Sequence, residues 1–403
     1  MSKTVNVSKS CPRQGLAICI PTYRRANLLK LLLEDLASQS CRPEIFIIID
    51  GDPQSNEVRQ SLDELATGTD PLTPTLPKVR YVASSHANLP YQRYLGWRVA
   101  QEENAEILLY LDDDLRVNQA DALAELMTPL AYNEAGVVGC TARIVYPEER
   151  EGQYGKALAD RAAHAKTRPS LLVRWFGSSR KVIPGSLSPS GHRCPPEIGS
   201  SKQTRVQWLR GGVMACRMDA LNEDCFSRDL FALAEVGYGH GEDTLLSLRL
   251  GAKGELAFVH SASFLHPCAD APKAYATHAR KMGFGVAYSR RLLNDNYRWP
   301  EGPKLRDRIA LLKSYLGTAL LQWIRTLKAP KAHRLAYAWG YTVGAVKGIL
   351  VPPRASRLTP GIDWGADAER NLGGLRKMRG MSGKNESESG NVNASRSEMI
   401  EVN

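Results

Sequence analysis

Short apolar segments alternate with amphipathic ones along the first third of the chain. Segments such as EIFIIID (44–50) and AEILLYLDD (105–113) are almost continuously apolar, which is typical of strands covered on both faces of a sheet. Segments such as NLLKLLLEDLAS (27–38) carry apolar residues at helical spacing. Strands that alternate with helices predict right-handed crossovers and a mainly parallel sheet. The predicted fold class is therefore α/β, with a Rossmann-like arrangement.

This alternation continues to residue 146. The expected strands cover 15–21, 44–50, 78–84, 105–113 and 136–146, and the expected helices cover 27–38, 55–66, 91–103 and 120–132. Residues 147–204 are rich in Gly, Pro, Ser, Lys and Arg, and a long insertion of this kind is usually a functional lid or disordered.

Regular structure is expected again after the insertion. The expected elements are an ordered stretch at 206–221, a helix at 241–250, a strand at 255–266 and a long helical region at 273–350. The domain boundaries that we expect are a catalytic domain over 14–270, a helical region over 271–352 and a polar, disordered tail over 380–403.

Composition narrows the class of protein. The net charge of +11 indicates an acidic partner, such as a nucleotide, an anionic membrane face or nucleic acid. The eight cysteines form no CxxC pair, which argues against a zinc site or a disulfide framework and fits a reducing compartment. The first residues lack the apolar core of a signal peptide, and no uninterrupted apolar run reaches the roughly 18 residues of a spanning helix. A cytoplasmic protein is expected.

Polar groups follow four of the expected strands. They are Pro21–Arg25, Asp50–Asp52, His86–Asn88 and Asp112–Asp114. In open α/β sheets ligands bind beyond the carboxyl ends of the strands, so these groups predict a cleft. The chain has no GxGxxG after the first strand and no GxxxxGK[ST], so a pyrophosphate in this cleft would be held by a metal and by arginines.

The three aspartates at 112–114 allow two interpretations. They form a solvated turn that caps the next helix, or they surround a divalent cation, because hard cations prefer carboxylate oxygens. Asp112 and Asp114 point to the same side of an extended segment. One could then bind the metal while the other reaches the ribose of a nucleoside diphosphate.

Six motifs together resemble glycosyltransferase family 2. In chain order they are IPTYRR, the strand-end Asp50, NLPYQRYLG, YLDDD, WLRGGVMACR and GEDTLLSLRLGAKG. The resemblance covers roughly residues 14 to 270 and implies the GT-A fold.

The resemblance also implies a nucleotide pocket and a metal site. The nucleotide-binding residues would be Pro21, Thr22, Tyr23, Arg24, Asp50, Arg93, Asp112 and Asp113. Asp50 would accept a hydrogen bond from uracil, although DGDP is also a good turn sequence. Arg93 would face the nucleotide, although a helix arginine is more often exposed. Mg²⁺ or Mn²⁺ would be bound by Asp112, Asp114 and His266, with His260 as a competitor for the histidine position.

The acceptor side and the general base come from the later motifs. Gly211 and Gly212 would let the backbone approach the sugars, or they form a bulge. Trp208 would be a platform for a sugar ring or a core residue. Asp243 would be the general base of an inverting displacement, and Glu242 would hold the acceptor or support the base. Acidic residues in a first helical turn are, however, favoured by the helix dipole alone.

The C-terminal third is basic and amphipathic. Residues 298–351 contain ten Lys/Arg and two acids, and apolar residues recur at helical spacing from 305 to 327. This face either binds an anionic membrane surface or packs on the catalytic domain. The segment 335–351 is apolar but short and contains Lys347, so peripheral attachment is expected.

The expected function is a metal-dependent, inverting glycosyltransferase that uses a UDP- or dTDP-sugar. Its acceptor would be a hydroxyl of a glycan or a lipid-linked molecule, in cell-surface polysaccharide or glycolipid synthesis. The alternative is a catalytically inactive nucleotide-sugar or membrane-binding protein of the same fold. The pI of 9.2 also suggests a nucleic-acid-binding protein, but no recognisable nucleic-acid module accompanies the basic residues, so nucleic acid is not an expected partner.

Overall fold

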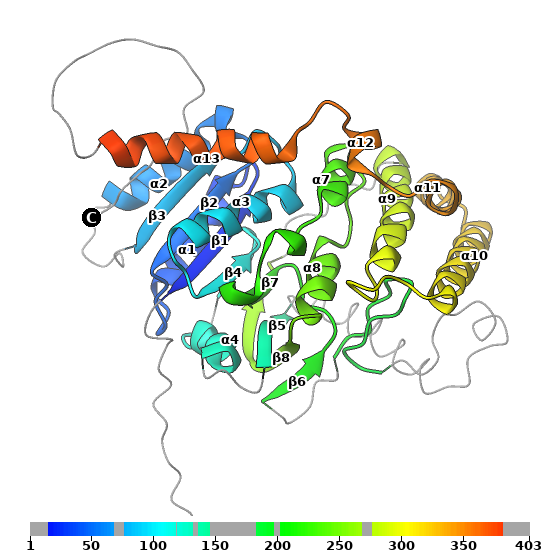
Figure 1. Cartoon of the computed structure of the whole chain (residues 1–403), viewed down its shortest axis with the longest axis horizontal. Coiled ribbons are helices and arrows are strands. Elements are labelled where there is room, and N and C mark those ends of the chain that lie inside the picture. The colour runs from blue at the N-terminus through cyan, green and yellow to red at the C-terminus, as the bar shows by residue number, and fades with distance from the viewer. Residues whose placement is uncertain are drawn as a thin grey trace, which may run out of the picture.

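The computed structural model describes residues 15–67, 76–117, 119–131, 136–145, 183–196, 202–267 and 276–381. Within them, one eight-stranded sheet has the order β3-β2-β1-β4-β7-β5-β8-β6 (Figure 1). The strands are β1 (Leu16–Thr22), β2 (Ile45–Asp50), β3 (Lys78–Ala83), β4 (Ile107–Leu111), β5 (Val137–Val145), β6 (Gln203–Val206), β7 (Val213–Arg217) and β8 (Glu255–Leu265).

The sheet is mixed but mostly parallel. β3, β2, β1 and β4 run parallel to one another, and β5 runs parallel to β8. β7 lies antiparallel between β4 and β5, and β6 pairs antiparallel with β8 at the edge. The predicted α/β class is confirmed, while the reversed direction of β7 was not predicted. Because β7 is reversed and Val213 pairs with Leu111, the turn before β7 lies at the edge where β4 ends.

Helices cover both faces of the sheet (Figure 1). In chain order they are α1 (Ala26–Ala37), α2 (Glu57–Thr67), α3 (Leu89–Glu102), α4 (Ala122–Ala131), α7 (Arg228–Glu235), α8 (Glu242–Gly251), α9 (Ala276–Asp295), α10 (Leu305–Lys328), α11 (Ala332–Leu350), α12 (Ala355–Leu358) and α13 (Trp364–Met381). The apolar residues of α1, α2 and α4 bury one face, and those of α3, α7, α8 and α13 bury the other. The near-continuous apolar strands follow from this double coverage.

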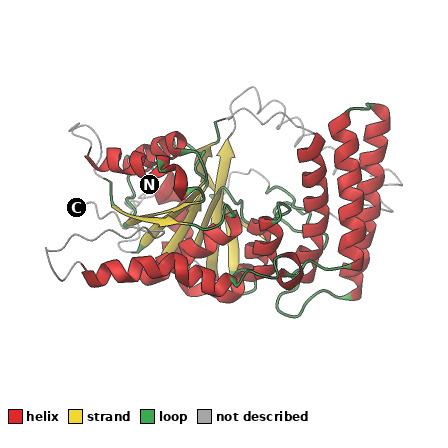
Figure 2. Ribbon diagram, turned by 90° about the horizontal axis from the view of Figure 1, so that it is seen from above, coloured by secondary structure: helices red, strands yellow, loops and turns green. Residues whose placement is uncertain are grey.

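The three long helices α9, α10 and α11 stand together at one side of the sheet (Figure 2). A small core that includes Leu311, Tyr315 and Tyr341 joins them. α11 approaches α9 closely: a Cβ atom at Gly340 would lie 2.1 Å from the carbonyl oxygen of Arg280. The helical C-terminal region is thus confirmed. Within the described residues no helix is long and apolar enough to cross a membrane.

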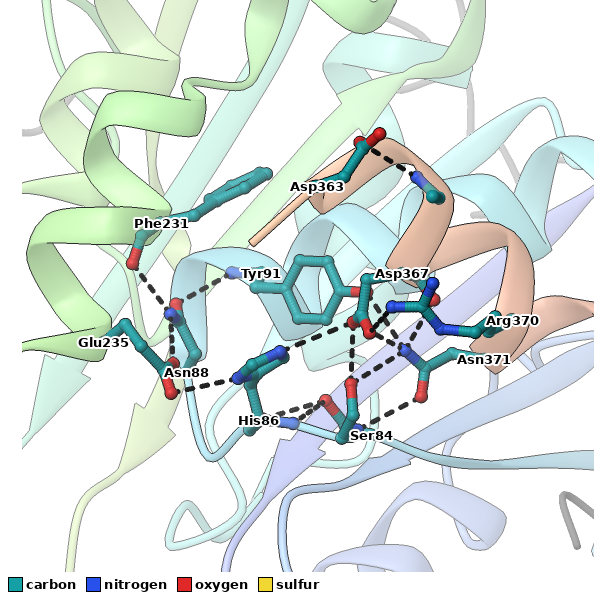
Figure 3. A network of polar contacts seen from close by, with 12 residues as sticks. Ser84, His86, Asn88, Tyr91, Phe231, Glu235, Asp363, Asp367, Arg370 and Asn371 are labelled. Atoms are coloured by element: carbon teal, nitrogen blue, oxygen red, sulfur yellow. Dashed lines mark hydrogen bonds and ion pairs between the residues drawn. The ribbon is translucent and has the colours of Figure 1, made fainter. Parts of the chain in front are cut away.

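The chain returns to the sheet in α13, which the pattern did not predict. Figure 3 shows the polar contacts between α13 and the segment before α3. The carboxylate of Asp367 accepts hydrogen bonds from the hydroxyls of Ser85 and Tyr91, each at 2.7 Å. The side-chain amide of Asn371 donates to the same two hydroxyls at 3.0 Å. We refer to these four residues as the C-terminal seam.

Three further expectations concern loops, the tail and cysteines. The segment expected as a loop between 221 and 241 contains α7. Most of the insertion 147–204 and nearly all of the tail 380–403 lie outside the described residues. Cys41 is disulfide-bonded, which departs from the expected set of reduced thiols, whereas the other described cysteines are free.

Candidate active site

The carboxyl ends of β1, β2 and β4 form one edge. The backbone N–H of Gly51 donates to the carbonyl of Thr22 at 2.9 Å, which keeps the ends of β1 and β2 in line. The Thr22 hydroxyl donates to Asp113 at 2.8 Å and so links β1 to the turn after β4. The sheet edge therefore brings together the strand-end groups that the sequence places there.

The three aspartates of this turn have different partners. Asp113 is 5% exposed and is bound by Thr22 and by Arg25, whose guanidinium lies 2.9 Å away. The same Arg25 nitrogen donates to Asp114 at 2.8 Å. The other oxygen of Asp114 lies 3.5 Å from Nε2 of His266, at the end of β8. Asp113 thus anchors the turn, whereas Asp114 lies beside His266.

Arg93 of α3 is the centre of the site. Its side chain is 3% exposed, and its Nη2 donates to Asp112 at 3.1 Å and to the carbonyl of Gly211 at 2.7 Å. Its Nη1 donates to Glu242 at 3.2 Å. One guanidinium therefore connects the turn after β4, the turn before β7 and the start of α8.

Burial raises the pKa of three carboxyl groups here, those of Asp112, Asp113 and Glu242. For Glu242 the neighbouring charge of Asp243 raises the pKa further. Burial disfavours the charged form, and nearby cations favour it. Arg93 and Arg25 therefore lower the free energy of these carboxylates, and a further cation at this edge would do the same.

The two glycines before β7 are tightly surrounded. A Cβ atom at Gly212 would lie 3.1 Å from Oδ2 of Asp112, and one at Gly211 would lie 3.2 Å from Cβ of Asp243. Side chains at either position would push these acids apart. Because these two glycines have no side chains, the acids of the turn after β4 and those at the start of α8 can lie close to the same loop.

Asp243 stands in the first turn of α8, after Gly241 in a left-handed conformation with φ of 79°. Its Oδ1 accepts from the N–H and hydroxyl of Thr244 at 2.7 and 3.2 Å, and its Oδ2 accepts from the N–H of Gly211 at 3.2 Å. Oδ2 also receives a very short hydrogen bond from Arg193. Arg193 was not among the predicted residues, because its segment reads as an irregular loop.

Of the other expected nucleotide residues, Tyr23, Arg24 and Asp50 lie at and just after the ends of β1 and β2. Tyr23 is 45% exposed, and the exposed Arg24 pairs with Asp52. Asp50 is fully buried, and burial raises the pKa of its carboxyl group. Its oxygens accept from the Tyr81 hydroxyl and the N–H of Asp52, each at 2.9 Å. Asp50 therefore fixes the turn after β2 from within.

The structure also defines the surroundings of Trp208 and of the two candidate histidines, His260 and His266. Trp208 is 7% exposed, its indole N–H donates to the carbonyl of Cys194 at 3.0 Å, and the Arg193 guanidinium lies 5.3 Å from the centre of its ring. His260 pairs with Thr204 of β6 at 2.7 Å. Of the two competing histidines, His266 is the one beside an aspartate of the acidic turn.

The side chains at this edge are of the kind that binds a hard divalent cation, but among the described residues they do not form a complete set of metal ligands. Asp112, Asp114 and His266 offer two carboxylates and an imidazole at one edge, although an arginine binds each carboxylate. Within the part of the chain that the structure describes, no three His, Cys, Asp or Glu side chains converge closely enough to hold a metal ion. The arginines bind Oδ1 of Asp112 and Oδ2 of Asp114, so each carboxylate has a second oxygen outside these two bonds.

Residues 17–182 match the model of the family described as glycosyl transferase family 2. The chain carries a glycosyl transferase family 2 domain. The match includes the acidic turn and Arg93, and it ends before Trp208, Asp243 and His266. The predictions of the family and of a glycosyltransferase are thereby confirmed.

Solved glycosyltransferase structures are also similar to the chain, at low identity. A mannosyltransferase from Pyrobaculum calidifontis, in complex with GDP-Man and Mn²⁺, is 14% identical, with 84% of this chain and 88% of that chain covered and a TM-score of 0.41. TarS 1–349 from S. aureus, in complex with UDP-GlcNAc, is 10% identical, with 84% and 93% covered and a TM-score of 0.40. No curated protein matches the chain.

Proposed function

We propose that this glycosyltransferase domain transfers a sugar from a nucleoside diphosphate donor, UDP or dTDP, to a hydroxyl acceptor with inversion. The supporting observation is the position of Arg93, which holds Asp112 and Glu242 within hydrogen-bond range of one buried guanidinium. The acidic turn and the start of α8 thus belong to one rigid site. A donor held at the turn would present its sugar toward Asp243.

The nucleotide would lie along the ends of β1 and β2. The exposed Tyr23 and Arg24 offer a ring face and a cation, and the buried Asp50 supports this surface by fixing the turn at Asp52. Arg25 lies between this surface and Asp114, where a diphosphate would gain charge-assisted hydrogen bonds.

Asp112, Asp114 and His266 would hold the expected Mg²⁺ or Mn²⁺. When bound, such a cation neutralises charge on the diphosphate leaving group. Asp113 keeps the turn in place through Thr22 and Arg25, so its role is positioning.

Asp243 would act as the general base. The acceptor oxygen attacks the anomeric carbon, the bond from that carbon to the diphosphate oxygen breaks with its electron pair leaving on the diphosphate, and the acceptor proton passes to Asp243. Glu242, held by Arg93, keeps the first turn of α8 in position. A general base in hydrogen-bond range typically contributes about 10²–10⁴ in rate.

Calorimetric titration with UDP, dTDP and GDP, each with and without Mn²⁺, tests the donor site. We expect one nucleotide to bind, more tightly with Mn²⁺, and Asp114→Ala to remove the effect of Mn²⁺. Binding of none of the three would contradict the donor proposal. Equal affinity of Asp114→Ala and the unsubstituted chain in saturating Mn²⁺ would contradict the metal role.

α10 and α11 share an exposed face whose composition supports a proposal for a second binding partner. The apolar stripe of α10 lies away from the helices on which α10 packs: Leu316 and Leu320 are 54% and 43% exposed, whereas Leu311 and Tyr315 are buried. On α11, Trp339 is 51% exposed. Ten Lys/Arg accompany these helices within 298–351. We refer to the exposed apolar residues of both helices as the apolar face.

Exposed apolar area next to basic residues is the composition of a surface that binds anionic membranes. We therefore propose that the apolar face attaches the protein peripherally to the inner face of the cell membrane. The acceptor would then be a glycan or a lipid-linked molecule, as in the synthesis of cell-surface polysaccharide or glycolipid.

A further inference from the structure

Asp243 has no free oxygen lone pair in this structure. A carboxylate offers about four acceptor positions. The described residues fill all four: Thr244 donates twice to Oδ1, and Gly211 and Arg193 donate to Oδ2. A general base must accept the hydroxyl that it deprotonates, so one of these donors has to leave before the reaction.

Arg193 is the donor that can leave. Thr244 is the neighbour of Asp243 in the chain, and the Gly211 turn is fixed by Arg93. Arg193 comes from a separate segment, and its side chain is 41% exposed.

The segment that carries Arg193 is a small hairpin, which we define as residues 186–194. The N–H of Cys194 donates to the carbonyl of Ser186, and the N–H of Ser188 donates to the carbonyl of His192, both at 2.9 Å. Gly191 forms its turn with φ of 75°. The turn is closed by the hydrogen bond from the N–H of Gly191 to the carbonyl of Ser188, at 2.9 Å.

The hairpin is anchored to the C-terminal helices and to the sheet. Asn294 of α9 donates to the carbonyl of Pro189 at 2.8 Å, and His192 lies 3.0 Å from the hydroxyl of Ser314 on α10. On the other side, Trp208 donates to the carbonyl of Cys194. The backbone of the hairpin is thus held while its arginine side chain remains exposed. Arg193 can leave Asp243 by a change of side-chain torsions and stay over the ring of Trp208.

We propose that Arg193 binds an anionic oxygen group of the acceptor, a phosphate or a carboxylate, and thereby releases Oδ2 of Asp243 for the acceptor hydroxyl. The proposal rests on the role of Asp243 proposed above. Arginine presents several N–H donors in one plane and pairs with planar or tetrahedral oxyanions through two hydrogen bonds. An acceptor without such a group leaves Arg193 on the base. Arg193 therefore selects for acidic acceptors.

Hydrolysis of the sugar donor measures whether Arg193 has released Asp243, because water then takes the place of the acceptor. In the full chain, we expect inorganic phosphate to raise nucleoside diphosphate release about tenfold, since a hydrogen bond to a charged group is worth about that much. Acetate is the carboxylate probe, and chloride is the control anion. Arg193→Gln should raise hydrolysis without phosphate about tenfold and abolish the effect of phosphate.

Arg205→Gln is the matched control. Arg205 is 46% exposed and is paired with Glu255, away from the acidic turn. This variant should keep the hydrolysis rate and the phosphate effect of the unsubstituted chain. Lower hydrolysis in Arg193→Gln, together with no phosphate effect in the unsubstituted chain, would overturn the proposal and leave Arg193 as a support for Asp243.

Two further measurements separate this proposal from the function on which it rests. Unchanged hydrolysis in Asp243→Asn would remove the base assignment itself.

Phosphate binding is also measurable without any donor, because Arg193 lies over Trp208. Titration with inorganic phosphate should change the tryptophan fluorescence of the unsubstituted chain but not that of Trp208→Phe or Arg193→Gln. No change in the unsubstituted chain would contradict anion binding at Arg193.

Discussion

At the scale of single residues, the site depends on charges that neutralise one another. Arg93 is almost inaccessible and touches two carboxylates and a carbonyl that come from three separate segments. A buried ion pair adds little net stability compared with apolar residues, but removal of one partner leaves an uncompensated charge. Arg93 is therefore a position where a substitution affects the whole site.

Replacement of Arg93 by methionine keeps most of the side-chain volume and removes the charge. We expect the free energy of unfolding to fall by about 3–5 kcal/mol, because Asp112 and Glu242 lose their shared partner. Chemical denaturation measures this. Arg24→Met is the control, because Arg24 is 64% exposed, and the loss of such a surface pair has little effect on the free energy of unfolding. Equal losses in both variants would contradict the central role of Arg93.

Asp243→Asn removes the proposed base with little change of shape. Turnover with the physiological acceptor should fall by about 10²–10⁴, while donor affinity by calorimetry stays within error. A variant that turns over normally would exclude Asp243 as the base. Loss of donor binding as well would indicate a structural role.

At the scale of elements, α13 supplies hydrogen-bond partners to Ser85, which lies between β3 and α3, and to Tyr91 in the first turn of α3. The Asp367 carboxylate receives hydrogen bonds from Ser85, Tyr91, Asn371 and Arg370. Burial acts to raise the pKa of Asp367, but the hydrogen bonds from Tyr91, Ser85 and Arg370 prevail and lower it. His86 lies beside this carboxylate and is also bound by Glu235 of α7 (Figure 3). The C-terminal seam thus ties α13 to α3, and His86 links it to α7.

Asp367→Asn should lower the free energy of unfolding by about 1.5–3 kcal/mol at neutral pH. Because the folded pKa of Asp367 is lowered, its contribution is complete above its unfolded pKa of about 3.9 and is lost as pH falls through the folded pKa. The difference between the two chains should therefore shrink at acidic pH. Denaturation curves over this pH range measure it. A difference independent of pH, or an equal loss in the control Glu369→Gln, would contradict the seam.

At the scale of the whole molecule, most of the exposed large apolar side chains of the described residues lie on α10 and α11, in the apolar face. Exposed apolar patches of this kind mark interaction sites. The sequence left open whether the stripe packs on the catalytic domain, and the exposure of Leu316 and Leu320 shows that this part of the stripe is not covered by the described residues.

The double substitution Leu320→Gln with Trp339→Gln should weaken binding to anionic vesicles at least about tenfold. Burial of one large apolar side chain is worth about 1.5–3 kcal/mol, and each 1.4 kcal/mol is a factor of about ten. Co-sedimentation measures the bound fraction. Ile183→Gln is the control, because Ile183 is 63% exposed and lies outside these helices. Unaltered sedimentation of the double variant would exclude the face as the attachment site.

Local patterns predicted β1 to β5, β8, the helices of the first half and the acidic turn, because periodicity and turn chemistry are properties of neighbouring residues. β6 was not predicted, because it begins within the segment expected to be an irregular insertion. They did not predict contacts between distant segments. The pairing of Arg193 with Asp243 joins residues 50 positions apart, and Ser85 with Asp367 joins residues 282 apart. The antiparallel course of β7 likewise depends on which strand lies beside it. The proposed general base could be named from its motif, but the arginine that covers it could not.

The long span of the C-terminal seam has a consequence during synthesis. At about 5–20 residues per second, roughly tens of seconds pass between the emergence of Ser85 and that of Asp367, which follows 282 residues later. In that interval Ser85 and Tyr91 lack the partners that α13 supplies, although the strands on either side are already made. The hydrogen bonds of Ser85 and Tyr91 to α13 are therefore among the last that the chain can form during synthesis. A chain that stops before Trp364 would keep every residue of the proposed chemistry and still lack the hydrogen bonds that Ser85 and Tyr91 make to α13.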